Sequence, residues 1–83
     1  MIEIVIRCLG GLKIEKGSFE QQFCLPSGST MLDLKKSLES LGFDFSDKEI
    51  AYVMDGYGLD HYPLDHPLSS RQVIYIFPLI SGG

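Results

Sequence analysis

The chain has 83 residues, of which 45% are hydrophobic and 22% charged, with a formal net charge of −4. This length fits one small domain with a modest core, and the acidic balance argues against nucleic-acid binding, which needs a basic stripe. The longest nearly apolar run, 73–80, is far shorter than the roughly 20 residues that a bilayer requires. Glu3 and Arg7 interrupt the start, unlike a secretory signal. We therefore expect a cytoplasmic protein that binds neither nucleic acid nor membrane.

The first third of the chain predicts a β-hairpin. Residues 2–9 (IEIVIRCL) alternate, and this period is typical of a strand with one buried side. One face carries Ile2, Ile4, Ile6 and Cys8, and the other carries Glu3, Val5 and Arg7. Glycines follow, and residues 19–25 form the returning strand.

The two cysteines, Cys8 and Cys24, are too few for a disulfide framework. In a reducing compartment we expect two reduced thiols in the core. An engaged pair facing across the hairpin stays open at this point.

The next segment predicts an amphipathic helix. Thr30 is placed to cap it, and the side chain of Asp33, three residues later, is placed to bond back to Thr30, as in a variant of the capping box. One apolar stripe follows at helical spacing, formed by Met31, Leu34, Leu38 and Leu41. The residues expected to face water are Lys35, Lys36, Glu39 and Ser40. Gly42 is expected to end the helix.

The second half predicts short strands between loops. Residues 43–49 form a loop with room for one helical turn, because Ser46 and Glu49 have capping-box spacing. A strand is expected at 50–54, a turn at 55–58 (DGYG) and a short strand at 59–62 that Pro63 ends. Leu64 and Leu68 are expected to attach the following connection to the core, before a last strand at 72–77.

This order of elements predicts an α+β fold of the β-grasp (ubiquitin-like) type. A single amphipathic helix must bury its stripe against a sheet, so we expect a mixed sheet of four to five strands with one main helix packed on one face. The first and last strands are the most hydrophobic and are placed side by side at the centre. Val73, Tyr75 and Phe77 alternate with Ile74 and Ile76, so both faces of the last strand are apolar. The face away from the helix is either an exposed patch for a partner or covered by loops.

Asp60-His61 and Asp65-His66 repeat a potential metal-ligand pair. Zinc normally takes three or four protein ligands, so Cys8, Cys24 or another chain would have to complete such a site. We favour surface histidines in a turn and expect no metal site. The lysines, which are expected to be solvated, are Lys13, Lys16, Lys35, Lys36 and Lys48.

The end of the chain, DHPLSSRQVIYIFPLISGG, resembles the small sulfur-carrier proteins of the β-grasp superfamily, namely the small subunit of molybdopterin synthase and the thiamine-pathway sulfur carrier. The matching residues are Asp65, His66, Pro67, Leu68, Phe77, Pro78, Ser81, Gly82 and Gly83. Residues 53–56 (VMDG) also resemble a turn of that family. Leu79 and Ile80 replace a Pro-Val pair, and Arg71-Gln72 replaces an acidic Gly-Asp dipeptide. The plain N-terminal hairpin is closer to the thiamine type.

The resemblance implies a domain at 1–78 and a flexible tail at 79–83 whose last residue is the substrate. Gly83 would be adenylated by an E1-like enzyme that uses ATP, and then converted to a thiocarboxylate by a sulfur-donor protein. Gly82 and Ser81 would thread the partner's active site. Binding to that enzyme or to a large catalytic synthase subunit would use Phe77, Pro78, Leu79 and Ile80. The chain itself would be a carrier rather than an enzyme, with no bound cofactor.

The residues also give physical reasons for such a tail. Glycines lack a Cβ and adopt whatever backbone angles a partner imposes, and Pro78 stops further strand pairing. Molybdopterin synthesis is the favoured pathway, while thiamine, cysteine and tRNA thiolation stay open. The other open interpretations are a ubiquitin-like modifier conjugated through Gly83 and an interaction domain with an inert tail.

Overall fold

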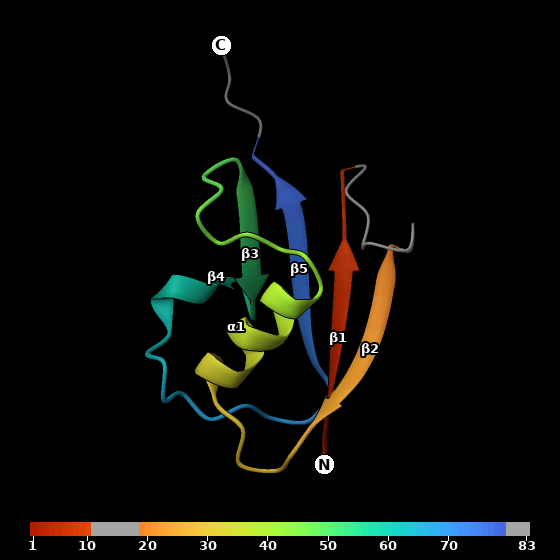
Figure 1. Ribbon diagram of the computed structural model, residues 1–83, viewed down its shortest axis with the longest axis vertical. Helices are drawn as coiled ribbons and strands as arrows, with labels where there is room; N and C mark the ends of the chain where they lie inside the picture. Colours follow the sequence, from red (N-terminus) through yellow and green to blue (C-terminus); the bar gives the residue numbers. More distant parts are fainter. Residues whose placement is uncertain (11–18, 80–83) are drawn as a thin grey trace.

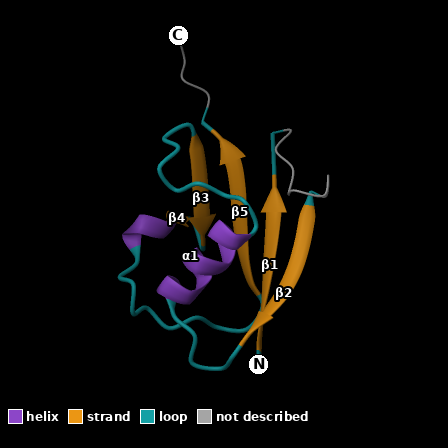
Figure 2. Cartoon of the chain, viewed as in Figure 1, coloured by secondary structure: helices purple, strands orange, loops and turns teal. Residues whose placement is uncertain are grey.

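The computed structural model describes residues 1–10 and 19–79, which build one five-stranded sheet with a single α-helix lying across one face (Figure 1). The elements are β1 (Ile2–Cys8), β2 (Glu20–Leu25), α1 (Met31–Ser40), β3 (Ile50–Met54), β4 (Tyr57–Gly58), a 3₁₀ helix (Leu59–His61) and β5 (Gln72–Pro78). The strand order is β2-β1-β5-β3-β4. The long connections run on the same side of the sheet as α1 (Figure 2).

The first and last strands are neighbours at the centre, as the sequence predicts. β1 and β5 are parallel, from Ile4 opposite Gln72 to Cys8 opposite Ile76. β2 is antiparallel to β1, and β3 is antiparallel to β5. This mixed sheet with one helix confirms the α+β, β-grasp architecture.

The helix begins and ends where the sequence predicts. The Asp33 carboxylate accepts hydrogen bonds from the Thr30 backbone N–H (2.8 Å) and the Thr30 hydroxyl (3.2 Å). At the other end, Gly42 has a φ of +99°. The Phe43 N–H donates to Leu38 (3.2 Å) and the Gly42 N–H to Glu39 (3.0 Å), which is the Schellman arrangement.

One apolar core lies between α1 and the sheet. Its completely buried side chains are Ile4, Ile6, Met31, Leu34, Leu38, Met54, Ile74 and Ile76. The alternate residues of β1 and β5 thus meet the helical stripe, because a strand has a period of two and a helix presents one face. Leu68 is buried beside them, as expected. No helix in the described part of the chain is long and apolar enough to cross a membrane.

The predicted short strand at 59–62 is wrong. The strand β4 comes earlier, at Tyr57–Gly58, because Asp55 and Gly56 form a two-residue hairpin turn with φ values of +53° and +83°. Such a turn requires left-handed angles at both positions, and Asp-Gly is one of its preferred sequences. Leu59–His61 then forms the 3₁₀ helix.

Three local expectations also need correction. Leu64 does not attach its loop to the core, since 52% of its surface is exposed. Ser46 and Glu49 form no capping box, because their N–H groups bond to the side chains of Asp44 and Asp47 in two successive turns. Lys35 is not freely solvated, because its ammonium contacts the Asp60 carboxylate at 2.9 Å.

Substituting two leucines of α1 tests the position of the core. Leu38 is completely buried, whereas Leu32 on the same helix is 40% exposed. We expect Leu38→Ala to lower the free energy of unfolding by about 2–5 kcal/mol, because it leaves a cavity. Leu32→Ala should change it by less than about 1 kcal/mol. Urea denaturation measures both, and equal losses would contradict the described packing.

Candidate functional site

The candidate site is the carboxyl end of β5, where the chain leaves the sheet. The end of β1 and the start of β3 lie at this same end of the molecule (Figure 1). The Leu9 N–H donates to the Ile76 carbonyl (2.8 Å), and the Leu79 N–H donates to the Glu49 carbonyl (2.7 Å). Both neighbours therefore hold β5 almost to its last residue.

Pro78 makes the two sides of β5 end differently. In a parallel ladder the next bond on the β1 side would run from the N–H of residue 78 to the Leu9 carbonyl. Proline has no N–H, so the pairing with β1 ends there. On the β3 side the pairing continues one residue further, to Leu79. The expectation that Pro78 stops further strand pairing holds toward β1 but not toward β3. The sequence does not predict the roles of Leu9 and Glu49, because a backbone group carries no side-chain signal.

The predicted partner-binding residues that the structure describes are close together. Phe77 and Pro78 are half-buried, and Leu79 has 52% of its surface exposed. Ile80, Ser81, Gly82 and Gly83 lie outside the described residues, so the roles predicted for them, and the tail at 79–83, stay predictions.

The sheet face away from α1 presents apolar side chains next to this end. We call it the open face and define it by Val5, Val53, Val73, Tyr75 and Phe77. Val5 is buried, Tyr75 is 37% exposed, and the other members are half-buried. The described part of the chain thus leaves apolar surface of the central strands in contact with solvent. An ion pair between Arg7 and Glu20 (3.1 Å) lies on the same face.

The loop 43–49 supports the site from the other side of β3. The pKa of the Asp44 carboxyl lies below its ordinary value, because the Ser46 hydroxyl (2.6 Å) and the Ser46 N–H (2.9 Å) both donate to it. The Tyr52 hydroxyl donates to the Asp44 carbonyl (3.3 Å). Burial, together with the charges of Asp47 and Asp44, raises the pKa of that tyrosine. This loop carries the Glu49 carbonyl that holds Leu79.

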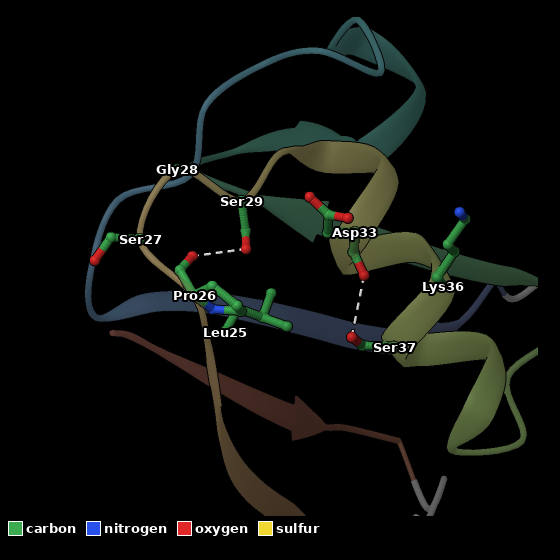
Figure 3. A pocket seen from close by; sticks show the side chains of 8 residues that line it. All are labelled: Leu25, Pro26, Ser27, Gly28, Ser29, Asp33, Lys36 and Ser37. Atoms are coloured by element: carbon green, nitrogen blue, oxygen red, sulfur yellow. Dashed lines mark hydrogen bonds between the residues drawn. The ribbon is translucent and has the colours of Figure 1, made fainter.

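The described residues line cavities, and two of these bear on the site. One of about 280 Å³ lies along the outer edge of β3 and includes Leu79 in its lining. Another, of about 470 Å³, lies at the start of α1 (Figure 3), at the end of the molecule opposite to the end of β5 (Figure 1). Two of its three serine hydroxyls already donate hydrogen bonds, Ser29 to Pro26 (2.7 Å) and Ser37 to the Asp33 carbonyl (3.0 Å).

The repeated Asp-His pairs do not converge on a metal site. His61 stacks on Tyr57 with ring centres 4.4 Å apart, and His66 lies against Tyr62 at 4.7 Å. Within residues 1–10 and 19–79, no three His, Cys, Asp or Glu side chains come close enough to hold a metal ion.

The cysteines are free, but only one of them lies in the core. Cys8 is buried, whereas Cys24 is exposed on the side of β2 that belongs to the open face. The predicted core position of Cys24 is therefore wrong. Cys24 is opposite Glu3. Cys8 is therefore five residues away along the ladder, roughly 17 Å at a strand's rise per residue, which is too far for a disulfide within the chain. Burial also raises the pKa of the Cys8 thiol, so it is protonated at neutral pH and a poor nucleophile.

Comparisons with solved structures identify the fold. A putative molybdopterin converting factor, subunit 1, from Pyrococcus furiosus superposes with a TM-score of 0.70 at 16% identity, covering 96% of this chain and 100% of that one. Small archaeal modifier protein 1 from Haloferax volcanii gives 0.68 at 16% identity over 98% and 99% of the two chains. The protein of that name from Methanosarcina acetivorans gives 0.58 at 22% identity over 100% and 98%. No family model matches the sequence, and no curated protein matches it significantly.

These likenesses confirm the ubiquitin-like β-grasp fold over almost the whole chain. The resemblance seen in the last third of the sequence therefore extends to the arrangement of all the elements. Among the neighbours are a putative molybdopterin converting factor subunit and small archaeal modifier proteins.

Thiol labelling tests the placement of the cysteines. Under native, reducing conditions iodoacetamide should modify Cys24 within minutes and leave Cys8 unmodified, because Cys8 is buried with a raised pKa. In urea both should react. Cys24→Ser should abolish native labelling, as read by intact mass, and rapid native labelling of Cys8 would contradict its burial.

The pair between Lys35 and Asp60 predicts a pH dependence of stability. The lysine lowers the pKa of the Asp60 carboxyl, first by its hydrogen bond and then by its charge. The stabilisation is therefore present at neutral pH and lost as the pH falls through the folded-state pKa. Asp60→Asn should cost less than about 1 kcal/mol at pH 7, because the carboxylate is exposed, and nothing once Asp60 is protonated. Asp65→Asn is the control, and urea titrations from pH 7 to 3 provide the measurement.

Proposed function

We propose that the chain is a cytoplasmic sulfur carrier protein, not a catalyst, whose C-terminal glycine, Gly83, is converted to a thiocarboxylate. The observation that carries the proposal is the end of β5. β1 holds the central strand up to Ile76 and β3 holds it up to Leu79, which is exposed, and residues 80–83 follow in sequence. A rigid body would thus present its own terminus to a partner.

The chemistry explains why such a carrier needs an activating partner. A terminal carboxyl ordinarily has a pKa of about 3.3–3.7, so at neutral pH it is an anion and a poor electrophile. An E1-like enzyme would use ATP to form the acyl-adenylate and release pyrophosphate. The terminal sulfur of a donor-protein persulfide would then attack the acyl carbon, and AMP would leave. A thiol would reduce the remaining S–S bond to the donor and release the thiocarboxylate. The Cys8 thiol is no activated nucleophile, because it is buried and its pKa is raised.

The tail and the open face would have separate tasks. Five residues from Leu79 to Gly83 span at most about 17 Å when extended, which is enough to enter a partner's active site. Gly82 and Ser81 would pass through its narrow part, because small residues avoid clashes there. Phe77, Pro78, Leu79 and Ile80, with the apolar open face, would provide the docking surface. The net charge of −4 fits a basic partner.

We place the carrier in molybdopterin synthesis, where a large catalytic synthase subunit would be a further partner. The D-H-P-L and F-P sequences support this pathway, as does the likeness to a molybdopterin converting factor subunit. Thiamine, cysteine and tRNA thiolation use the same activated terminus and remain alternatives within the proposal.

The second candidate is a protein modifier joined through Gly83 to lysines of other proteins. The likeness to small archaeal modifier proteins favours it. It shares the adenylation step with the carrier and differs in the acceptor, an amine instead of a sulfur atom.

The intact mass of protein purified from its own host tests the first candidate. A thiocarboxylate adds the mass difference between one sulfur and one oxygen, and fragmentation should place it at Gly83. Incubation with ATP, a sulfur source and the cognate activating enzyme should increase the modified fraction. A variant without Gly83 should gain no sulfur while unfolding at the same urea concentration as the wild type. An unmodified wild type after this incubation would contradict the carrier, whereas Gly83-dependent adducts of higher mass in lysates would favour the modifier.

A further inference from the structure

Gly10 lies against the ring of Pro78, at the point where β5 ends. A Cβ built on Gly10 would lie 2.8 Å from Cδ and 2.9 Å from Cγ of that ring. Contacts this short do not occur between real side chains, so any other residue at position 10 would displace the proline or the backbone. The Gly10 backbone has a φ of +65°, which also favours glycine.

This contact lies where the pairing of β5 with β1 ends. The ladder to β1 ends after the bond from Leu9 to Ile76, and Gly10 follows immediately. The pyrrolidine ring occupies the space that a Gly10 side chain would fill. On the opposite side, the Leu79 N–H is bonded to Glu49 at 2.7 Å. Pro78 therefore lies between Gly10 on the β1 side and the hydrogen bond from Leu79 to Glu49 on the β3 side.

We infer that Gly10 is a positioning residue for the reaction of the C-terminus: the absence of its side chain sets the place of Pro78, and hence the direction in which residues beyond Leu79 leave the sheet. The inference about geometry stands on the contact itself, while its consequence for adenylation rests on the proposed function. Gly10 itself would touch neither ATP nor the reacting carboxyl.

A displaced Pro78 would carry Leu79 with it, because the two are consecutive in the chain. The Leu79 hydrogen bond to Glu49 would lengthen, and the terminus would approach the activating enzyme from a different angle. A misplacement of about 1 Å can cost on the order of 100-fold in rate. The open face is unchanged by such a shift, whereas Pro78 and Leu79 of the proposed docking surface move. Binding would therefore weaken less than the reactive step.

Gly10→Ala is the test, and Gly28→Ala is its matched control. Gly28 also has a positive φ, of +89°, but nothing lies within 4 Å of its Cβ position. Both variants thus introduce the same kind of backbone strain, and only one of them touches Pro78. Amide exchange of Leu79, followed by NMR, needs no partner. It should accelerate roughly tenfold in Gly10→Ala and less than about twofold in Gly28→Ala.

A double-mutant cycle shows whether the effect acts through the ring. In a Pro78→Ala background, Gly10→Ala should no longer change the Leu79 exchange rate, because no ring remains to be displaced. Equal exchange in Gly10→Ala and Gly28→Ala, or an undiminished effect of Gly10→Ala without the ring, would overturn the inference.

The functional arm uses ATP–pyrophosphate exchange by the cognate activating enzyme. Gly10→Ala should lower kcat about 10- to 100-fold and raise the KM for the carrier by a smaller factor, because the open face still binds. Gly28→Ala should match the wild type. Equal kcat values for the two variants would overturn the positioning role in the reaction. If the wild type itself supports no exchange, the proposed function fails, and the amide measurements still decide the geometric part.

Discussion

The parallel pairing of β1 with β5 is the constraint on which the rest of the structure depends. A parallel pair cannot be joined by a tight turn, so the chain between the two strands must cross over the sheet. It does so through α1, whose buried leucines cover the isoleucines of both strands. The same pairing puts the ends of β1 and β5 at one end of the sheet, beside the start of antiparallel β3 (Figure 1). The place where the chain leaves the domain follows from this topology.

Main-chain chemistry then decides how the chain leaves. At the end of β5, the chain at the end of β1 presents the Leu9 carbonyl and the chain before β3 presents the Glu49 carbonyl. Pro78 has no N–H and cannot donate to the Leu9 carbonyl. Pairing therefore stops at Leu9 on the β1 side and continues to Glu49 on the β3 side. The loop before β3 can support this last bond because its own turns are closed by Asp44 and Asp47. An exit built from backbone groups depends on side chains chiefly at Gly10 and Pro78, where the proline ring fills the place of a Gly10 side chain.

The sequence predicts the elements well because their periods are properties of single segments. The stripe of α1, its cap at Thr30 and the alternation of β1 and β5 are local, and all are confirmed. The position of β4 depends on turn chemistry: the sequence predicts a four-residue turn at 55–58, whereas Asp55 and Gly56 alone form the turn. Cys24, Lys35 and the contact of Gly10 with Pro78 depend on register and on distant residues, so no local pattern contains them. The docking role proposed for Phe77 and Pro78 comes only from the resemblance of the tail motif to a family, since no local pattern indicates it.

Under the proposed function, the tail would supply what carriers and modifiers have in common, and the domain would supply what distinguishes their partners. Activation of a terminus needs only a main-chain carboxyl on a chain of small residues, and carriers and modifiers would meet this need alike. The choice of partner must then come from side chains that the domain holds rigidly near the exit. Under the proposed function the open face would provide them, with Tyr75 and Phe77 on the central strand that ends at the exit. Because these rings and the exit belong to one strand, a partner bound to the open face would also fix where the terminus is delivered.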